Sequence, residues 1–272
     1  VAPPVVAVVV ARDPGPWVEE TIAALAEQDY PNLSILVVDA ASAEEVKPRV
    51  GRAAPGAFVR RLEENPGFGA AANEVLEVVE GAAFYLVCHD DIAPDPDVVR
   101  VLVEEAYRSN AAVVGPKLVA WDDRRHLLQL GEGIDHAGYT IPLVERGELD
   151  QEQHDAVRDV FSVPGACTLV RADLYAEIGG FDEGIDYLFD DVSLCWRAHV
   201  AGARVVVAPF ARVRHLEALS VRRPVDDRRR LQARHRLRVV MSCYSLLVLT
   251  LVLPRMLVLN AAEDVYSLIV RP

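Results

Sequence analysis

The chain begins with short, uniformly apolar runs separated by longer amphipathic stretches. The first run, VVAVVVA at 5–11, is rich in β-branched residues, which is typical of a parallel strand covered on both faces. A helix is predicted to begin at Pro16 and to end before Pro31, because proline suits the first turn of a helix and disfavours helical backbone in the residue before it. The cycle continues to residue 115 and predicts strands at 33–39, 57–61, 83–88 and 111–115, with helices at about 42–51, 69–80 and 95–108.

The alternation of predicted strands and helices stops after residue 115 and resumes at about residue 166. Residues 116–163 are polar and only weakly periodic, and a connection of this length is usually functional. Periodicity resumes with a strand at 166–170, a helix from about 171 closed by Gly179 and Gly180, a helix at 192–201 closed by Gly202, and a strand at 203–208. This alternation predicts an α/β fold with a mostly parallel sheet flanked by helices, and a ligand site at the carboxyl ends of the strands.

The last part of the chain differs in composition. Between residues 212 and 238 there are ten arginines and three acidic residues, followed by an apolar stretch that Pro254 and Arg255 interrupt. The interruption makes this stretch a poor spanning helix by itself, so we predict a helical extension over 217–272. The arginines are compatible with a solvated helix face, with an anionic membrane surface contacted through 212–259 or a polyprenyl-phosphate-linked acceptor, or with nucleic acid.

Composition and charge narrow the classes of function. With 272 residues, 51% of them hydrophobic, the chain can form one large domain or one domain with an appendage. Its net charge of −13 argues against a general nucleic-acid binder, which needs positive surface for phosphate contacts. The four cysteines form no CxxC pair, so the sequence indicates neither a zinc ribbon nor a disulfide framework and favours a reducing, cytosolic compartment. The first apolar run lacks the basic flank and cleavage site of a signal peptide, so we interpret it as a strand.

Acidic side chains follow the ends of several predicted strands. Asp13, Asp39 and the triplet His89-Asp90-Asp91 each come at or after the carboxyl end of a strand, so we expect them to face one crevice. Carboxylates beside an imidazole suit a divalent cation such as Mn²⁺ or Mg²⁺. The alternative is that Asp90 and Asp91 are turn and capping residues ahead of the following prolines.

A second acidic pair, Asp190-Asp191, stands just before an amphipathic helix. Either residue can be an N-cap, or an ionised carboxylate facing the crevice can act as a general base. Two acidic clusters also leave a glycoside hydrolase open as an alternative. The run from Gly67 to Ala72 fits GxGxxA, but two strand-helix units precede it, so it is only a weak indication of a dinucleotide site.

Five segments with motif character follow one another over roughly residues 4–216. They are VVVARDPGPWVEETIAALAEQDYPNLSILVVDAAS, ENPGFGAAANEVLE, CHDDIAPDP, VPGACTLVRADLYAEIGGFDE and FDDVSLCWRAHVAGARVVVAPFARVRH. Their order and content resemble the inverting, GT-A-fold enzymes of glycosyltransferase family 2, particularly bacterial rhamnosyl- and galactofuranosyltransferases. The resemblance implies a GT-A domain at 1–216, with a nucleotide-sugar-binding half at 1–115 and an acceptor-binding and catalytic half at 116–216.

The resemblance also implies roles for single residues. Asp39 matches a residue that binds the base or ribose of the donor, and Asp91 matches the metal-binding carboxylate of the DxD motif, whose first Asp is replaced here by His89. His215 matches a histidine that completes the metal site in some members, and Asp191 matches the catalytic base, with Asp190 in the place usually held by Glu. The other residues expected beside the nucleotide-sugar are Ala11, Arg12, Asp13, Asn65, Gly69, Asn73 and Asp90.

The function expected from the resemblance is metal-dependent, inverting transfer of a sugar from a UDP-, dTDP- or GDP-sugar to a glycan or polyprenyl-linked acceptor in cell-envelope assembly. The expected location is the cytoplasmic face of a bacterial plasma membrane, as a peripheral protein or as part of a larger membrane protein. Because His89 replaces an Asp, an inactive nucleotide-sugar-binding module of a larger membrane protein remains the alternative. Regions 116–163 and 182–189 are expected to face the acceptor. The candidate sugar-stacking residues are Trp121, His136, Tyr139 and Trp196, although side chains of these types more often serve packing alone.

Overall fold

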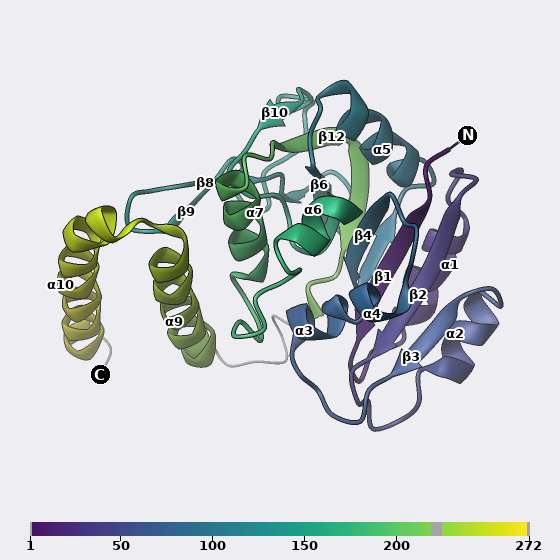
Figure 1. The fold of residues 1–272 in the computed structure, drawn as a ribbon, viewed down its shortest axis with the longest axis horizontal. Coiled ribbons are helices and arrows are strands. Elements are labelled where there is room, and N and C mark those ends of the chain that lie inside the picture. Colours follow the sequence, from purple (N-terminus) through teal and green to yellow (C-terminus); the bar gives the residue numbers. More distant parts are fainter. Residues whose placement is uncertain (1, 219–224, 271–272) are drawn as a thin grey trace.

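A single large sheet forms the centre of the protein in the computed structural model, which describes residues 2–218 and 225–270 (Figure 1). Within these residues the sheet has ten strands, and eight of them follow the order β10-β12-β6-β11-β4-β1-β2-β3, with β5 pairing to β12 and β7 to β6. The strands of the main path are β1 (Val5–Ala11), β2 (Leu33–Asp39), β3 (Phe58–Arg61), β4 (Phe84–His89), β6 (Val113–Ala120), β10 (Arg158–Asp159), β11 (Cys167–Arg171) and β12 (Val205–His215).

The sheet is mostly parallel, as the alternating pattern predicted. Strands β3, β2, β1 and β4 run parallel to one another, and β12 runs parallel to β6. Strand β11 is antiparallel to both of its neighbours, β4 and β6, and so joins the two parallel groups. Because parallel strands end at the same edge, the residues that follow β1, β2 and β4 are brought to one side of the molecule.

Helices cover both faces of the sheet, which explains why β1 is apolar at every position. Val5, Ala7 and Val9 pack into one buried cluster, and Val6 and Val8 pack into another on the opposite face. The first cluster includes side chains of α1 (Val18–Ala26), α2 (Lys47–Ala53) and α5 (Val98–Arg108). The second includes side chains of α3 (Phe68–Asn73), α4 (Val75–Val78), α6 (Ala172–Glu177) and α7 (Asp190–Val200).

Two predicted helices differ from the observed ones for local reasons. The helix expected at 42–51 begins only at Lys47, because the buried carboxylate of Asp39 accepts the backbone N–H of Ser42 at 2.9 Å and holds the intervening residues in a turn. The helix expected at 69–80 is divided into α3 and α4 at Glu74.

The segment 116–163, expected to be an irregular connection, carries regular structure. It contributes the end of β6, the short strands β7 (Leu127–Gln129) and β10, and a hairpin of β8 (Glu132–Ile134) with β9 (Thr140–Pro142). The buried ammonium of Lys117 anchors the segment: its Nζ lies 3.0 Å from Asp150 Oδ2 and also pairs with Asp155. Buried ion pairs therefore act together with apolar side chains of the same segment, such as Leu127, Leu130 and Val144, which pack into the second cluster.

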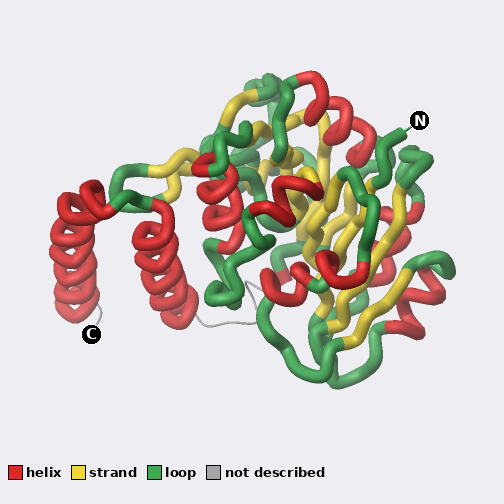
Figure 2. The backbone as a smooth tube through the Cα atoms, in the orientation of Figure 1, coloured by secondary structure: helices red, strands yellow, loops and turns green. Residues whose placement is uncertain are grey.

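The C-terminal part is helical, as predicted, with α9 (Val225–Cys243) and α10 (Leu246–Val270). The two helices form a hairpin beside α7, at the opposite side of the molecule from β3 (Figures 1 and 2). A third apolar cluster joins them to the domain and includes Trp196 of α7, Val239 and Val240 of α9, and Met256 of α10. No helix within the described ranges combines the length and the apolar composition that crossing a bilayer requires.

Candidate functional site

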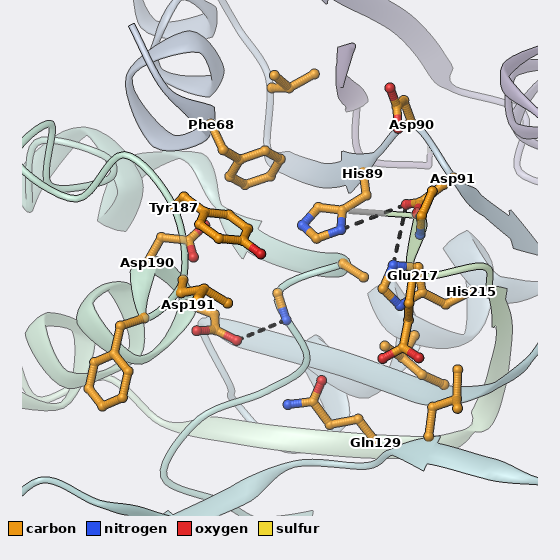
Figure 3. Close-up of a pocket in the computed structure, with 18 of the residues that line it drawn as sticks. Phe68, His89, Asp90, Asp91, Gln129, Tyr187, Asp190, Asp191, His215 and Glu217 are labelled. Atoms are coloured by element: carbon orange, nitrogen blue, oxygen red, sulfur yellow. Dashed lines mark hydrogen bonds and ion pairs between the residues drawn. The ribbon is translucent and has the colours of Figure 1, made fainter. Parts of the chain in front are cut away.

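A cavity of about 470 Å³ opens where the carboxyl ends of the parallel strands meet. His89, at the end of β4, and the following Asp90 and Asp91 line one side, and Asp190 and Asp191 at the start of α7 line the other. Figure 3 shows these two acidic groups facing each other across open space. The sequence-based expectation of one shared crevice therefore holds for these five residues.

His89, Asp91 and His215 form a compact group of metal-ligand type. Each offers one ligand atom, and the three atoms lie within 4.8 Å of one another. Asp91 Oδ1 lies 3.8 Å from His89 Nδ1 and 3.3 Å from His215 Nε2. Strand β5 (Ile92–Pro94), which immediately follows Asp91, pairs with the end of β12, and this pairing brings His215 to Asp91 although they are far apart in sequence.

The electrostatics of this group favour an ionised carboxylate at Asp91 beside a neutral imidazole at His89. Burial by itself would raise the pKa of Asp91, but the neighbouring His215 and His89 and the N–H of Ala218, 2.7 Å from Oδ2, hold that pKa at about 2. Burial lowers the pKa of His89 to about 4, against the attraction of Asp91. At neutral pH the group therefore carries a negative charge and an imidazole lone pair, as a divalent cation requires.

The opposite wall is formed by the first turn of α7. Phe189, in the N-cap position, adopts a left-handed φ of 73°, so the chain turns sharply into Asp190 and Asp191. Both oxygens of Asp191 accept backbone N–H groups: Oδ1 that of Val192 at 2.8 Å and Oδ2 that of Gly165 at 3.2 Å. A Cβ on Gly165 would lie 2.9 Å from Asp191 Cβ, so this close approach requires glycine.

Burial raises the pKa of three carboxyl groups on this wall. Burial, and then the charge of Asp191, raise the pKa of Asp190 to about 7. The same two causes raise the pKa of Glu132, on β8, to about 7, against the hydrogen bonds that its carboxylate accepts. Burial also raises the pKa of Asp191, although the amides of Val192 and Gly165 favour its charged form. Paired carboxyl groups of this kind are suited to accepting a proton at physiological pH.

A model of the glycosyltransferase-like family 2 matches residues 3–237. The chain belongs to this family. It is therefore a glycosyltransferase by family, and the resemblance carried by the five sequence motifs is confirmed.

This glycosyltransferase is similar to curated bacterial proteins that are named for sugar transfer and for O-antigen biosynthesis. The N-acetylglucosaminyl-diphospho-decaprenol L-rhamnosyltransferase of Mycobacterium tuberculosis is 27% identical over 86% of this chain and 81% of its own length. The O-antigen biosynthesis protein RfbC of Myxococcus xanthus is 26% identical over 73% of this chain, but that match covers only 16% of RfbC.

Solved structures with the same fold include GalNAc-T7 in complex with UDP, GalNAc and Mn²⁺, with a TM-score of 0.65 and 13% identity. The match covers 78% of this chain and 43% of that protein. TarS of Staphylococcus aureus in complex with UDP matches with a TM-score of 0.58 and 18% identity over 85% of this chain and 65% of the solved one. The GT-A fold is thus confirmed.

The residues expected beside the nucleotide-sugar separate into two groups in this glycosyltransferase. Arg12, Asn65 and Asp90 line the cavity. Asp39 is buried and does not line it: its Oδ2 accepts Arg61 Nη1 at 2.6 Å, while Oδ1 accepts the amide of Ser42. Ala11, also buried, and Asp13, whose Oδ1 accepts the N–H of Ala43 at 2.7 Å, lie outside the lining as well.

Gly69 and Asn73 serve the packing of the domain in this structure. A Cβ on Gly69 would meet Phe181 Cβ at 2.7 Å. The Asn73 carboxamide accepts Tyr175 Oη–H at 2.7 Å and the Phe181 N–H at 2.8 Å, and it donates to the Phe181 carbonyl at 3.0 Å. These contacts fasten the segment that leads to Asp190 and Asp191.

Several lining residues carry no sequence signal that points to a site. Gln129, Glu132 and Arg146 come from segment 116–163, and Tyr187 comes from the loop before α7, the two regions expected to face an acceptor. Phe68, at the start of α3, and Glu217, after β12, complete this part of the lining, and Glu217 forms an ion pair with Arg146. None of the four candidate stacking residues, all within the described ranges, lines the cavity: Trp121, His136, Tyr139 and Trp196.

Proposed function

We propose that this glycosyltransferase moves a sugar from a nucleoside-diphosphate sugar to a hydroxyl group of a lipid-linked or glycan acceptor, with inversion of the anomeric centre. The observation that carries the proposal is the pair of groups facing each other across one cavity: His89, Asp91 and His215 on one wall, Asp190 and Asp191 on the other. One wall suits the diphosphate of the donor and the other suits a reacting hydroxyl.

The first wall fits a divalent cation. His215 Nε2 is buried and makes no hydrogen bond, although it lies 3.3 Å from Asp91 Oδ1. A buried polar atom without a hydrogen bond is costly, and a cation shared with Asp91 and His89 would satisfy it. Mn²⁺ or Mg²⁺ held by these three side chains would stabilise the negative charge that develops on the departing diphosphate.

Asp191 is the proposed base. Its two backbone hydrogen bonds fix the carboxylate at the cavity wall, where it accepts the proton of the acceptor hydroxyl. The hydroxyl oxygen forms its bond to the anomeric carbon while the bond from that carbon to the diphosphate oxygen breaks, and the electron pair leaves with the nucleoside diphosphate. A single displacement inverts the anomeric configuration and requires no covalent intermediate. Asp190, with a pKa of about 7, is placed to share the proton.

The C-terminal hairpin supports a membrane-bound acceptor. Leu246, Leu247 and Leu251 of α10 are 83%, 77% and 75% exposed, and α9 exposes Arg229 and Arg230 on a protein whose net charge is −13. Exposed apolar side chains and exposed arginines on the same helical hairpin suit an anionic lipid surface. Sedimentation with neutral and with anionic vesicles tests this part: equal binding to both, or to neither, would remove it.

Calorimetric titration tests the donor site. UDP, dTDP and GDP are each titrated with and without Mn²⁺ into the wild type, Asp91→Ala and Asp122→Ala, an exposed carboxylate that serves as the control. We expect one nucleotide to bind more tightly with Mn²⁺ in the wild type and in the control, and to lose that gain in Asp91→Ala. Binding without sugar transfer to any acceptor would identify a nucleotide-sugar-binding module instead of an enzyme.

A further inference from the structure

The turn that leads into the catalytic pair is strained. Leu188 and Phe189 have left-handed φ values of 62° and 73°, although neither is a glycine. Such a conformation is unfavourable for a residue with a side chain and persists only where surrounding contacts impose it. Because Asp190 follows immediately, the contacts that impose this turn also determine the direction of the first turn of α7.

One of those contacts comes from the C-terminal extension. His235 of α9 is fully buried, and its Nδ1 lies 3.0 Å from the carbonyl oxygen of Leu188. A carbonyl only accepts hydrogen bonds, so Nδ1 is the protonated nitrogen that donates. The other ring nitrogen, Nε2, lies 3.2 Å from Asp186 Oδ1 but makes no hydrogen bond, so the contact from Nδ1 is the one that holds the turn.

The next turn of α9 strengthens the attachment. Arg238 donates from Nε and Nη2 to the two oxygens of Asp182, both at 2.8 Å, and its guanidinium packs against Gly184, where a Cβ would lie 2.2 Å from Cζ. Arg238 follows His235 at the i+3 position, so the two side chains lie on one face of the helix. The loop 182–189 is therefore fastened to α9 near both of its ends.

Helix α9 also contacts the β8–β9 hairpin, from which Glu132 lines the cavity. Arg236 places its guanidinium 3.5 Å from the centre of the Tyr139 ring, and Val240 packs where Gly138 has no side chain. Both contacts are made to the turn of the β8–β9 hairpin, which carries Glu132. Helix α9 thus links the two elements that form the proton-accepting wall.

We propose that His235 is a positioning residue for sugar transfer, which holds the Leu188 carbonyl so that Asp190 and Asp191 face the cavity. His235 does not line the cavity, so it acts through the turn and not on the substrate. The proposal rests on the proposed function of Asp191 as the base. It assigns to the arginine-rich extension a role in the catalytic geometry, in addition to any contact with lipid.

Two substitutions separate the hydrogen bond from the volume of the side chain. His235→Leu fills the space without a donor, whereas His235→Asn places an N–H near the position of Nδ1. Gln232→Ala, an exposed position on the same helix, is the control. We expect the Leu variant to lower kcat by about 10- to 100-fold with the donor KM within about twofold of wild type, because a base displaced by a fraction of an ångström loses alignment. The Asn variant should recover most of the loss.

Hydrogen exchange of the peptide covering 182–193 provides a readout that does not depend on transfer. Its amides should exchange faster in His235→Leu than in wild type and return toward wild type in His235→Asn. Equal exchange in all variants, unchanged kcat in His235→Leu, or equal impairment of both variants with parallel changes in KM, would overturn the positioning role. If the wild type itself transfers no sugar, the proposed function fails, and the exchange pattern alone decides whether His235 holds the turn.

Discussion

Replacing Asp191 by Asn is the most direct perturbation of the proposed chemistry. The two side chains have the same shape, but the amide has no charge and accepts no proton at neutral pH. In the wild type, both carboxylate oxygens accept backbone N–H groups, from Val192 at 2.8 Å and from Gly165 at 3.2 Å. Asn keeps one oxygen, so one of these two amides then faces an NH₂ group.

These contacts set the expected magnitudes. The loss of one hydrogen bond to a charged acceptor costs about 1.5–3 kcal/mol, so the free energy of unfolding should fall by about 2 kcal/mol. Because burial raises the pKa of Asp191, removal of its charge recovers part of that loss. The loss of a general base lowers the rate by about 10²- to 10⁴-fold. The expected fall in rate is therefore far larger than the small change in stability explains.

The assay measures sugar transfer and donor binding on the same preparations. The Asn variant should bind the nucleotide identified by calorimetry with unchanged affinity, because His89, Asp91 and His215 are untouched, and its kcat should fall as stated. Asp122→Asn, an exposed substitution of the same kind, should leave both quantities unchanged. A transfer rate within about threefold of wild type would refute the role of Asp191 as the base.

Three further substitutions test separate parts of the structure. Glu132→Gln should change the pH dependence of stability, because burial and the charge of Asp191 raise the pKa of Glu132 from 4.5 to about 7. The wild type should therefore lose stability relative to the variant as the pH rises through this range, which urea unfolding at several pH values measures. Asn73→Ala removes a carboxamide that makes three hydrogen bonds and should lower the free energy of unfolding by about 2–4 kcal/mol, with nucleotide affinity unchanged; weaker nucleotide binding in a stable protein would contradict this. Lys117→Met leaves the buried Asp150 with fewer positive partners and should cost about 3 kcal/mol in urea unfolding, whereas an unchanged midpoint would show that the ion pair contributes nothing net.

The sequence pattern was sufficient to locate the cavity because parallel strands share a direction. A β-branched apolar run identifies a buried strand, and the acidic residues after such runs must then meet at one edge of the sheet. His89, Asp90 and Asp91 follow β4 in this way, and the antiparallel strand β11 between β4 and β6 does not disturb that edge. The predictions for these residues required only the period of the pattern and the topology that it implies.

The pattern was not sufficient where a carboxylate or amide has two suitable sets of partners. Asp39 and Asn73 occupy positions that match a nucleotide-binding motif, yet in this structure their polar atoms bond to the protein itself. The choice between an internal and an external partner depends on where Arg61 and Tyr175 lie after folding, which no local pattern specifies. Glu132 was missed for a related reason, because the hairpin that presents it lies in a polar segment with no clear period.

The pKa values of the carboxyl groups differ between the two walls of the cavity. On one wall, two imidazoles and a backbone amide hold the pKa of Asp91 at about 2, so this carboxylate remains charged throughout the physiological range, as a group that binds a cation must. On the other wall, burial and mutual repulsion raise the pKa values of Asp190 and Glu132 to about 7, so these groups exchange protons within that range. Carboxyl groups of similar intrinsic acidity thus acquire different pKa values across one cavity, through burial and through the neighbours that the fold supplies. In one orientation, the diphosphate of the donor lies at the first wall and the hydroxyl of the acceptor lies at the second, and each would meet the carboxylate suited to it. The reverse orientation would place a dianionic diphosphate against carboxyl groups that cannot all ionise.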